Sequence, residues 1–122
     1  MSNIPRISES ELEIMRILWA KTPCTANDVI EELNKTWKPN TVKTFISRLV
    51  KKNVVSFKED GRSYYYYPLV SEEEYLRTES ESFLKRIYGG ALKPMLVNFI
   101  RDDETLSSED IAELKRLLDK KE

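Results

Sequence analysis

The sequence predicts a mainly α-helical protein that carries one small β-hairpin. Apolar residues recur with the helical period along most of the 122 residues. Several of these stretches begin with a Ser or Thr that is followed three residues later by Glu or Asp, as at helix starts. Between residues 54 and 67 the helical period gives way to two β-prone runs joined by a glycine-containing turn. We therefore expect three helices, a hairpin and then three further helices.

The first two helices are expected over residues 9–20 and 26–34. Ser8 and Glu11 have the spacing of a capping box at the first helix, and Thr22-Pro23 should break the chain after it. A third helix should carry Pro39 in its first turn, where the missing N–H costs little. Its core-facing stripe follows the spacing i, i+3, i+4, i+7, i+8 and comprises Val42, Phe45, Ile46, Leu49 and Val50.

The β-prone runs cover residues 54–58 and 63–67, with Glu59-Asp-Gly-Arg62 between them. An Asp-Gly pair between two such runs is a strong hairpin signal, and Pro68 should end the second strand. Three helices followed by a hairpin is the order of elements in a winged helix-turn-helix domain. We place this domain at residues 1–69.

The remaining residues, 70–122, predict three amphipathic helices over 71–88, 93–101 and 108–120, with Gly89-Gly90 ending the first. About fifty residues is marginal for an independent core. We therefore expect this part to be a helical dimerisation domain that pairs with a second copy of the chain. The apolar residues expected at this homodimer interface are Phe83, Leu84, Ile87, Tyr88, Leu92, Leu96, Phe99, Ile100, Ile111, Leu114, Leu117 and Leu118.

The formal net charge of −1 conceals an uneven distribution of charge. Residues 35–63 hold eight cations and two anions, a local charge of +6, whereas residues 69–122 hold nine cations and thirteen anions, a charge of −4. A basic middle beside an acidic tail indicates a local site for a polyanion.

The basic segment coincides with the third helix and the hairpin, which predicts a site for double-stranded DNA. The face of this helix opposite the apolar stripe holds no carboxylate, and its cations can neutralise phosphates while Asn, Thr and Ser meet base edges. Lys58 and Arg62 flank the hairpin tip and could follow the phosphate backbone or enter the minor groove. For either residue taken alone, a solvated loop without a DNA contact is an open alternative. The predicted DNA-binding residues are Asn40, Thr41, Lys43, Thr44, Ser47, Arg48, Lys51, Lys58 and Arg62.

The composition argues against an enzyme, a metal site or a bound cofactor. The chain has no histidine, a single cysteine (Cys24) and only three glycines, so the usual general base, metal ligands and glycine-rich phosphate loop are missing. The first residues lack the apolar stretch of a signal peptide, and no run approaches the ~20 apolar residues of a membrane helix. We expect a cytoplasmic protein without membrane insertion.

Several stretches resemble the BlaI/MecI penicillinase-repressor family of bacterial transcription regulators. The likeness is carried by residues 7–19, by the expected third helix (residues 39–52), by the Gly61-Arg-x-x-x-Tyr-x-Pro68 stretch and by matching stretches in the C-terminal half, including Leu96-Val-Asn-Phe99. The resemblance implies a homodimer that sits on an operator dyad and represses transcription. In the β-lactam-responsive members a membrane sensor and protease pathway ends repression by a cut between Asn and Phe, which implies Asn98-Phe99 here.

Two alternatives remain open at the level of sequence. A repressor of the same family could control unrelated genes in response to a different signal, although the paired Cys-x-Cys motifs of the copper-responsive branch are absent. A winged-helix module could also act as an adaptor that binds proteins and never meets DNA. The carboxylate-free face of the third helix argues against the adaptor.

Overall fold

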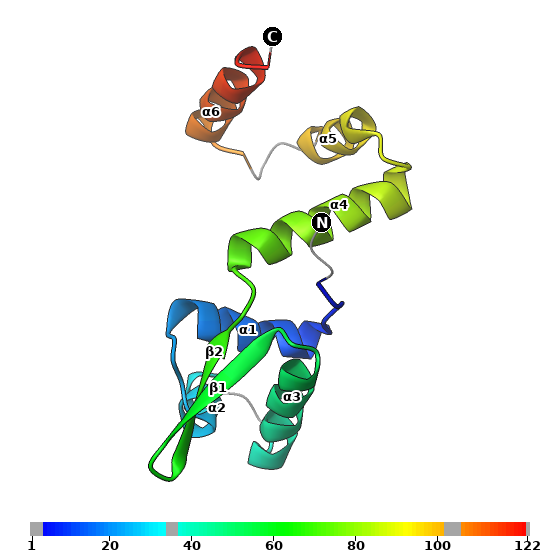
Figure 1. The fold of residues 1–122 in the computed structure, drawn as a ribbon. Coiled ribbons are helices and arrows are strands. Elements are labelled where there is room, and N and C mark those ends of the chain that lie inside the picture. The colour runs from blue at the N-terminus through cyan, green and yellow to red at the C-terminus, as the bar shows by residue number, and fades with distance from the viewer. Residues whose placement is uncertain (1–3, 34–36, 102–105, 122) are drawn as a thin grey trace. The chain divides into compact units, whose positions relative to one another are not determined.

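The computed structural model describes residues 4–33, 37–101 and 106–121, and it contains six helices and one hairpin in those ranges (Figure 1). The elements are α1 (Glu9–Ala20), α2 (Ala26–Leu33), α3 (Pro39–Lys51), β1 (Val55–Asp60), β2 (Ser63–Pro68), α4 (Glu72–Tyr88), α5 (Leu92–Ile100) and α6 (Ser108–Asp119). The predicted mainly α fold with a β-hairpin wing is confirmed. The chain divides into two compact units, Met1–Glu79 and Ser80–Glu122, and α4 runs through the point of division.

The start of α1 is fixed by the predicted capping box. The backbone N–H of Glu11 donates to Ser8 Oγ at 3.1 Å, and the backbone N–H of Ser8 donates to Glu11 Oε1 at 2.7 Å. Two of the amide groups left over at the helix start are thereby satisfied. Ile14, Met15 and Leu18 are buried on the inner face of the helix.

The core of the first unit gathers side chains from α1, α2, α3, the hairpin and the first turns of α4. In α3 the stripe predicted from the sequence points inward, with Val42, Ile46 and Leu49 buried and Phe45 and Val50 packed at its edge. The buried apolar residues are Ile7, Ile14, Met15, Leu18, Cys24, Val29, Val42, Ile46, Leu49, Val54, Val55 and Tyr75.

The hairpin is an antiparallel pair in which Phe57 lies opposite Tyr66 and Asp60 lies opposite Ser63. The strands are longer than predicted, so Gly61 and Arg62 alone form the turn, in place of the four residues Glu59 to Arg62. Gly61 has a φ of 66°, which suits a two-residue turn with glycine in its first central position. Cys24 exchanges two backbone hydrogen bonds with Tyr66, at 3.0 and 2.7 Å, and so joins the hairpin to the segment that precedes α2.

The beginning of α4 is held against α1. The indole N–H of Trp19 donates to the carbonyl of Val70 at 2.8 Å, and the rings of Trp19 and Tyr75 lie 5.8 Å apart. Tyr75 is 5% exposed. The first turns of α4 therefore belong to the core of the first unit.

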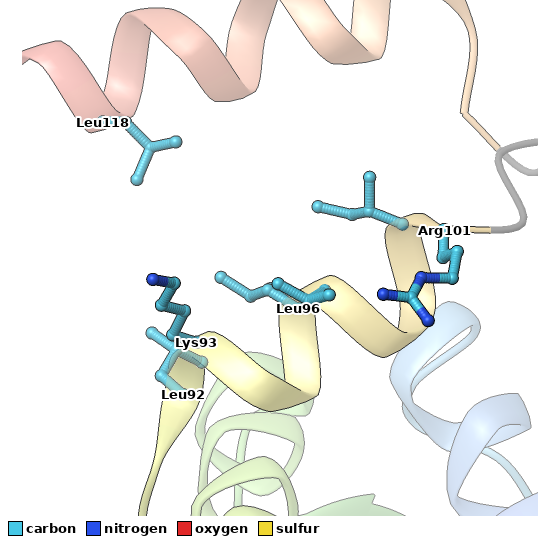
Figure 2. A pocket seen from close by; sticks show the side chains of 7 residues that line it. Leu92, Lys93, Leu96, Arg101 and Leu118 are labelled. Atoms are coloured by element: carbon cyan, nitrogen blue, oxygen red, sulfur yellow. The ribbon is translucent and has the colours of Figure 1, made fainter.

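The second unit presents apolar side chains that it does not bury. α4 ends at Tyr88, and Gly89, the next residue, has a φ of 59°, the left-handed conformation that glycine adopts at helix ends. Neither α5 nor α6 contains a buried residue. An open groove of about 610 Å³, shown in Figure 2, is lined by five residues of α5 between Leu92 and Ile100, by Arg101 and by Leu118 of α6. The lining is almost wholly apolar, apart from Lys93 and Arg101.

Candidate nucleic-acid interface

The helix α3 separates its residues cleanly between two faces. Pro39 occupies the first helical position, and the buried stripe holds one side of the helix against the core. The other side carries no carboxylate, and every residue predicted there to meet DNA is exposed. These residues are Asn40, Thr41, Lys43, Thr44, Ser47, Arg48 and Lys51.

Two side chains on this exposed face have local partners. The hydroxyl of Thr44 donates to the backbone carbonyl of Asn40 at 2.9 Å, so its single proton is used within the helix. Its methyl group and the acceptor capacity of its oxygen remain for an outside partner. The guanidinium carbon of Arg48 lies 5.8 Å from the centre of the Phe45 ring, a cation–π distance that restrains an otherwise mobile side chain.

The wing adds two further cations. Lys58 lies on β1 opposite Tyr65, and Arg62 is the second residue of the two-residue turn; both are exposed. Glu59 and Asp60 stand next to them near the tip and offset part of their charge. The wing can therefore approach a polyanion through individual side chains, while the carboxylate-free surface belongs to α3.

The fold brings Lys43 of α3 and Arg62 of the wing to the lining of the same open hollow, of about 360 Å³. The start of α2, from Thr25 to Asn27, lines the same hollow with Tyr64 and Tyr66. Two cations beside a helix N-terminus suit a phosphate group, because the helix dipole adds to their positive charge.

The contribution of α2 to this hollow was missed at the level of sequence. The Thr25-x-x-Asp28 spacing marks the helix start, and the structure shows both of its reciprocal hydrogen bonds, at 3.0 and 3.1 Å. That spacing gives no indication that the helix start lies beside Lys43.

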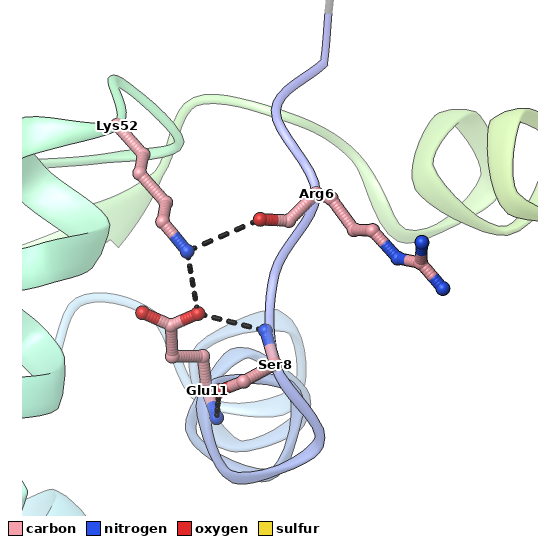
Figure 3. A network of polar contacts seen from close by, with 4 residues as sticks. All are labelled: Arg6, Ser8, Glu11 and Lys52. Atoms are coloured by element: carbon pink, nitrogen blue, oxygen red, sulfur yellow. Dashed lines mark hydrogen bonds and ion pairs between the residues drawn. The ribbon is translucent and has the colours of Figure 1, made fainter.

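Lys52, next to Lys51 in the sequence, contacts other parts of the protein and does not belong to the exposed face of α3. Its ammonium group lies 2.7 Å from Glu11 Oε1 and donates to the carbonyl of Arg6 at 3.1 Å (Figure 3). Burial raises the pKa of Glu11, but the Lys52 ammonium and the N–H of Ser8 lower it more, and the pKa lies below its ordinary value. Glu11 is 2% exposed. Its charge pair with Lys52 links the C-terminal end of α3 to α1.

The residues predicted at the dimer interface lie in α4, α5 and α6. Phe83, Leu84 and Tyr88 are half-buried. The others are exposed, namely Ile87, Leu92, Leu96, Phe99, Ile100, Ile111, Leu114, Leu117 and Leu118. Single exposed apolar residues are common on protein surfaces, whereas a large exposed apolar patch is typical of an interaction surface.

Both residues of the predicted cleavage site, Asn98 and Phe99, lie in the helix α5 and are exposed. The side-chain amide of Asn98 donates to the Tyr88 hydroxyl at 2.9 Å, and the Phe99 ring stacks on Phe83 with centroids 6.5 Å apart. The bond between them is therefore part of a helix and not of an exposed loop.

The described ranges hold no group of three or more metal-ligating side chains. Within the same residues, every helix is too short or too polar to cross a lipid bilayer.

Comparison with known proteins matches residues 7–120 to the model of the family described as penicillinase repressor. The chain is 41% identical to the penicillinase repressor of Bacillus licheniformis, over 98% of this chain and 94% of that protein. It is 38% identical to the methicillin resistance regulatory protein MecI of Staphylococcus aureus strain N315, over 94% of each.

Among solved structures, the chain is similar to the solution structure of monomeric Bacillus licheniformis BlaI in complex with the blaP half-operator. The TM-score is 0.54 at 39% identity, and the match covers 62% of this chain and 94% of that one. Family model, relatives and fold agree, and the chain belongs to the penicillinase repressor family.

Proposed function

We propose that this repressor binds a palindromic DNA operator as a homodimer, with residues 1–69 contacting DNA and residues 70–122 joining the two copies. The observation that carries the proposal is the exposed face of α3, which presents cations and small polar side chains without a single carboxylate. Cations release counterions from phosphates, while Asn and Thr can meet base edges. The complex of Bacillus licheniformis BlaI with a half-operator supports the same role for this chain.

Dimerisation follows from the apolar surface of the second unit. Among the described residues of this unit, ten large apolar side chains are exposed in the single chain, and covering such side chains contributes roughly 1.5–3 kcal/mol each when burial is complete. A second copy offers the same surface in return, as a twofold interface requires. Pairing would hold two α3 helices about one turn of DNA apart and raise the effective concentration of the second half-site.

The regulated genes are proposed to be those of a β-lactam response, by similarity to relatives named for penicillinase and methicillin resistance. A protease linked to a sensor would act in the cytoplasm and cut between Asn98 and Phe99. The cut would detach α6 from the rest of the chain and remove part of the apolar surface that joins the dimer. Loss of pairing would then lower operator affinity and end repression.

The test is to measure both the oligomeric state and the DNA preference of the full chain. Analytical ultracentrifugation should show a dimer, and footprinting upstream of its own gene should protect two symmetric half-sites. A monomer at working concentrations with equal affinity for palindromic and bulk genomic DNA would refute the proposal. Absence of any salt-dependent binding to duplex DNA would instead favour a protein-binding adaptor.

A further inference from the structure

The charge pair between Glu11 and Lys52 joins two elements that lie far apart in the sequence. Glu11 is in the first turn of α1, and Lys52 is the residue that caps the C-terminal end of α3. The pair is short, at 2.7 Å, and the same ammonium group also holds the carbonyl of Arg6 (Figure 3). One lysine therefore connects α3, α1 and the segment that precedes α1.

The pair is poorly explained as a device for stability alone. Glu11 is almost fully buried, and its Oε2 atom has no hydrogen-bond partner among the described residues. A buried charge with an unsatisfied oxygen is costly, and apolar residues of similar volume often replace such pairs without loss of stability. An apolar contact would not fix the orientation of α3 relative to α1, because hydrophobic attraction has no preferred direction. A charge-assisted hydrogen bond has a preferred geometry and can fix that orientation.

The pair lies where the orientation of α3 relative to the rest of the unit is set. Asn53 follows Lys52 with a φ of 62° and turns the chain from α3 toward the wing. The two elements proposed to touch DNA thus diverge from this point. Asn40 lies about 18 Å along the helix from Lys52, so a rotation of about 5° at the Lys52 end would move it by roughly 1.5 Å. A shift of that size breaks a hydrogen bond to a base edge.

We propose that Glu11 and Lys52 are positioning residues for operator recognition, and that their charge pairing fixes the direction of α3 in the groove. Neither side chain needs to touch DNA for this role. The inference rests on the proposed function, because it requires that the N-terminal half of α3 reads bases.

The decisive variant removes both charges and keeps the helix cap. Glu11→Gln combined with Lys52→Met leaves an amide that can still accept from the Ser8 N–H, and it leaves no unpaired charge. At an unfolding midpoint close to that of the wild type, the ratio of operator affinity to nonspecific affinity should fall about tenfold or more, as one lost base contact would cause. An unchanged ratio in the folded double variant would overturn the proposal.

Two single variants keep the proposal testable if the double variant does not fold. Lys52→Arg retains a cation opposite Glu11 and should hold the ratio within about threefold of the wild type. Glu11→Gln alone should lower the ratio about tenfold, because it removes the anion and keeps the cap. Equal ratios for these two variants would overturn the proposal.

A matched control exists in the same unit. Lys21 and Glu32 form an exposed ion pair at 2.9 Å between the end of α1 and α2, so Lys21→Met with Glu32→Gln removes the same two charges. This control should leave the ratio of operator affinity to nonspecific affinity unchanged. A tenfold fall of that ratio in the control would show that loss of any ion pair has this effect, and it would overturn the positioning role.

Failure of the proposed function is detected separately, with the wild type and with Lys51→Ala. If the wild type shows no salt-dependent binding to duplex DNA, the proposed function fails. If Lys51→Ala weakens binding but the Glu11 and Lys52 variants keep the wild-type ratio, only the positioning role fails.

Discussion

The hydroxyl of Tyr88, at the end of α4, accepts a hydrogen bond of 2.9 Å from the side-chain amide of Asn98 in α5. This contact crosses the turn at Gly89 and Gly90 and holds the predicted cleavage residue to the preceding helix. The backbone of α5 continues past it, since the N–H of Arg101 donates to the carbonyl of Val97 at 3.0 Å. A protease that needs an extended peptide has to open this arrangement first.

Removing the hydroxyl should loosen α5. A hydrogen bond of this kind contributes about 0.5–1.5 kcal/mol, so Tyr88→Phe should make the amides of α5 exchange with solvent about two- to tenfold faster. Hydrogen exchange followed by mass spectrometry measures this rate. Tyr65→Phe, in the other unit, provides the control, and equal exchange of α5 in all three proteins would contradict the prediction.

A chain that ends at Asn98 should dimerise more weakly than the full chain. It lacks Phe99, Ile100 and all of α6, which together carry six of the exposed apolar side chains. The loss of even a few of these contacts, at roughly 1.5 kcal/mol each, raises the dissociation constant by more than tenfold. Sedimentation equilibrium measures the constant, and the release mechanism is wrong if the truncated and full chains dimerise equally well.

Lys51 should act as a phosphate contact. Lys51→Ala should weaken binding to all DNA sequences and reduce the slope of log affinity against log salt by about one. Fluorescence anisotropy over a salt series measures the slope. Lys115→Ala, on the exposed surface of α6, removes the same charge and should leave the slope unchanged; a slope that Lys51→Ala fails to alter would exclude a phosphate contact.

The methyl group of Thr44 should matter more for base discrimination than its hydroxyl. The hydroxyl proton is already bound to the carbonyl of Asn40, whereas the methyl group is available to a thymine methyl. Thr44→Ser should therefore lose more discrimination than Thr44→Val. Asn40→Ala should cost about 1–3 kcal/mol of operator preference. Competition binding against operators with single base changes tests all three, and a greater loss in Thr44→Val would reverse the assignment.

The stabilisation that the Glu11 carboxylate gives to the folded state should be lost in acid. Its pKa lies below the ordinary value of 4.5, because the lowering by Lys52 and Ser8 exceeds the raising by burial. The carboxylate stabilises the folded state fully above its unfolded pKa, and that stabilisation is lost as the pH falls through the lowered folded pKa.

Glu11→Gln isolates this contribution. The variant should be less stable than the wild type by about 1–3 kcal/mol at neutral pH, because Lys52 loses its partner. The difference should shrink on passing from about pH 6 to about pH 3.5, because below the ordinary pKa of 4.5 the unfolded chain takes up a proton while the folded carboxylate, with its lowered pKa, resists it. Urea unfolding at both pH values measures it, and a constant difference would rule out Glu11 as the titrating group.

Local patterns predicted the elements well. The start of α1 follows from the Ser8 cap, and the inward face of α3 follows from the spacing of Val42, Ile46 and Leu49, because each depends on residues within two helical turns. The turn of the wing was placed too broadly, since Asp60 pairs with Ser63 across the strands and only Gly61 needs a left-handed backbone.

Contacts between distant residues were beyond these patterns. The bond between Glu11 and Lys52 spans 41 positions, and the Trp19 indole reaches a carbonyl 51 positions away. The hollow that joins the start of α2 to Lys43 and Arg62 is likewise a product of packing. No periodicity encodes such contacts, because the tertiary fold alone decides which surfaces meet.

The division of α3 into a buried stripe and an exposed face has a consequence for how such proteins diverge. None of the side chains proposed to meet DNA is needed to hold the helix in place, since Val42, Ile46 and Leu49 do that from the opposite side. Operator preference can therefore be rewritten by exchanging outward-facing residues while the scaffold is inherited intact. Lineages that share this framework are free to acquire new target genes. Transplanting the outward-facing residues of α3 from one member to another should transfer the operator preference.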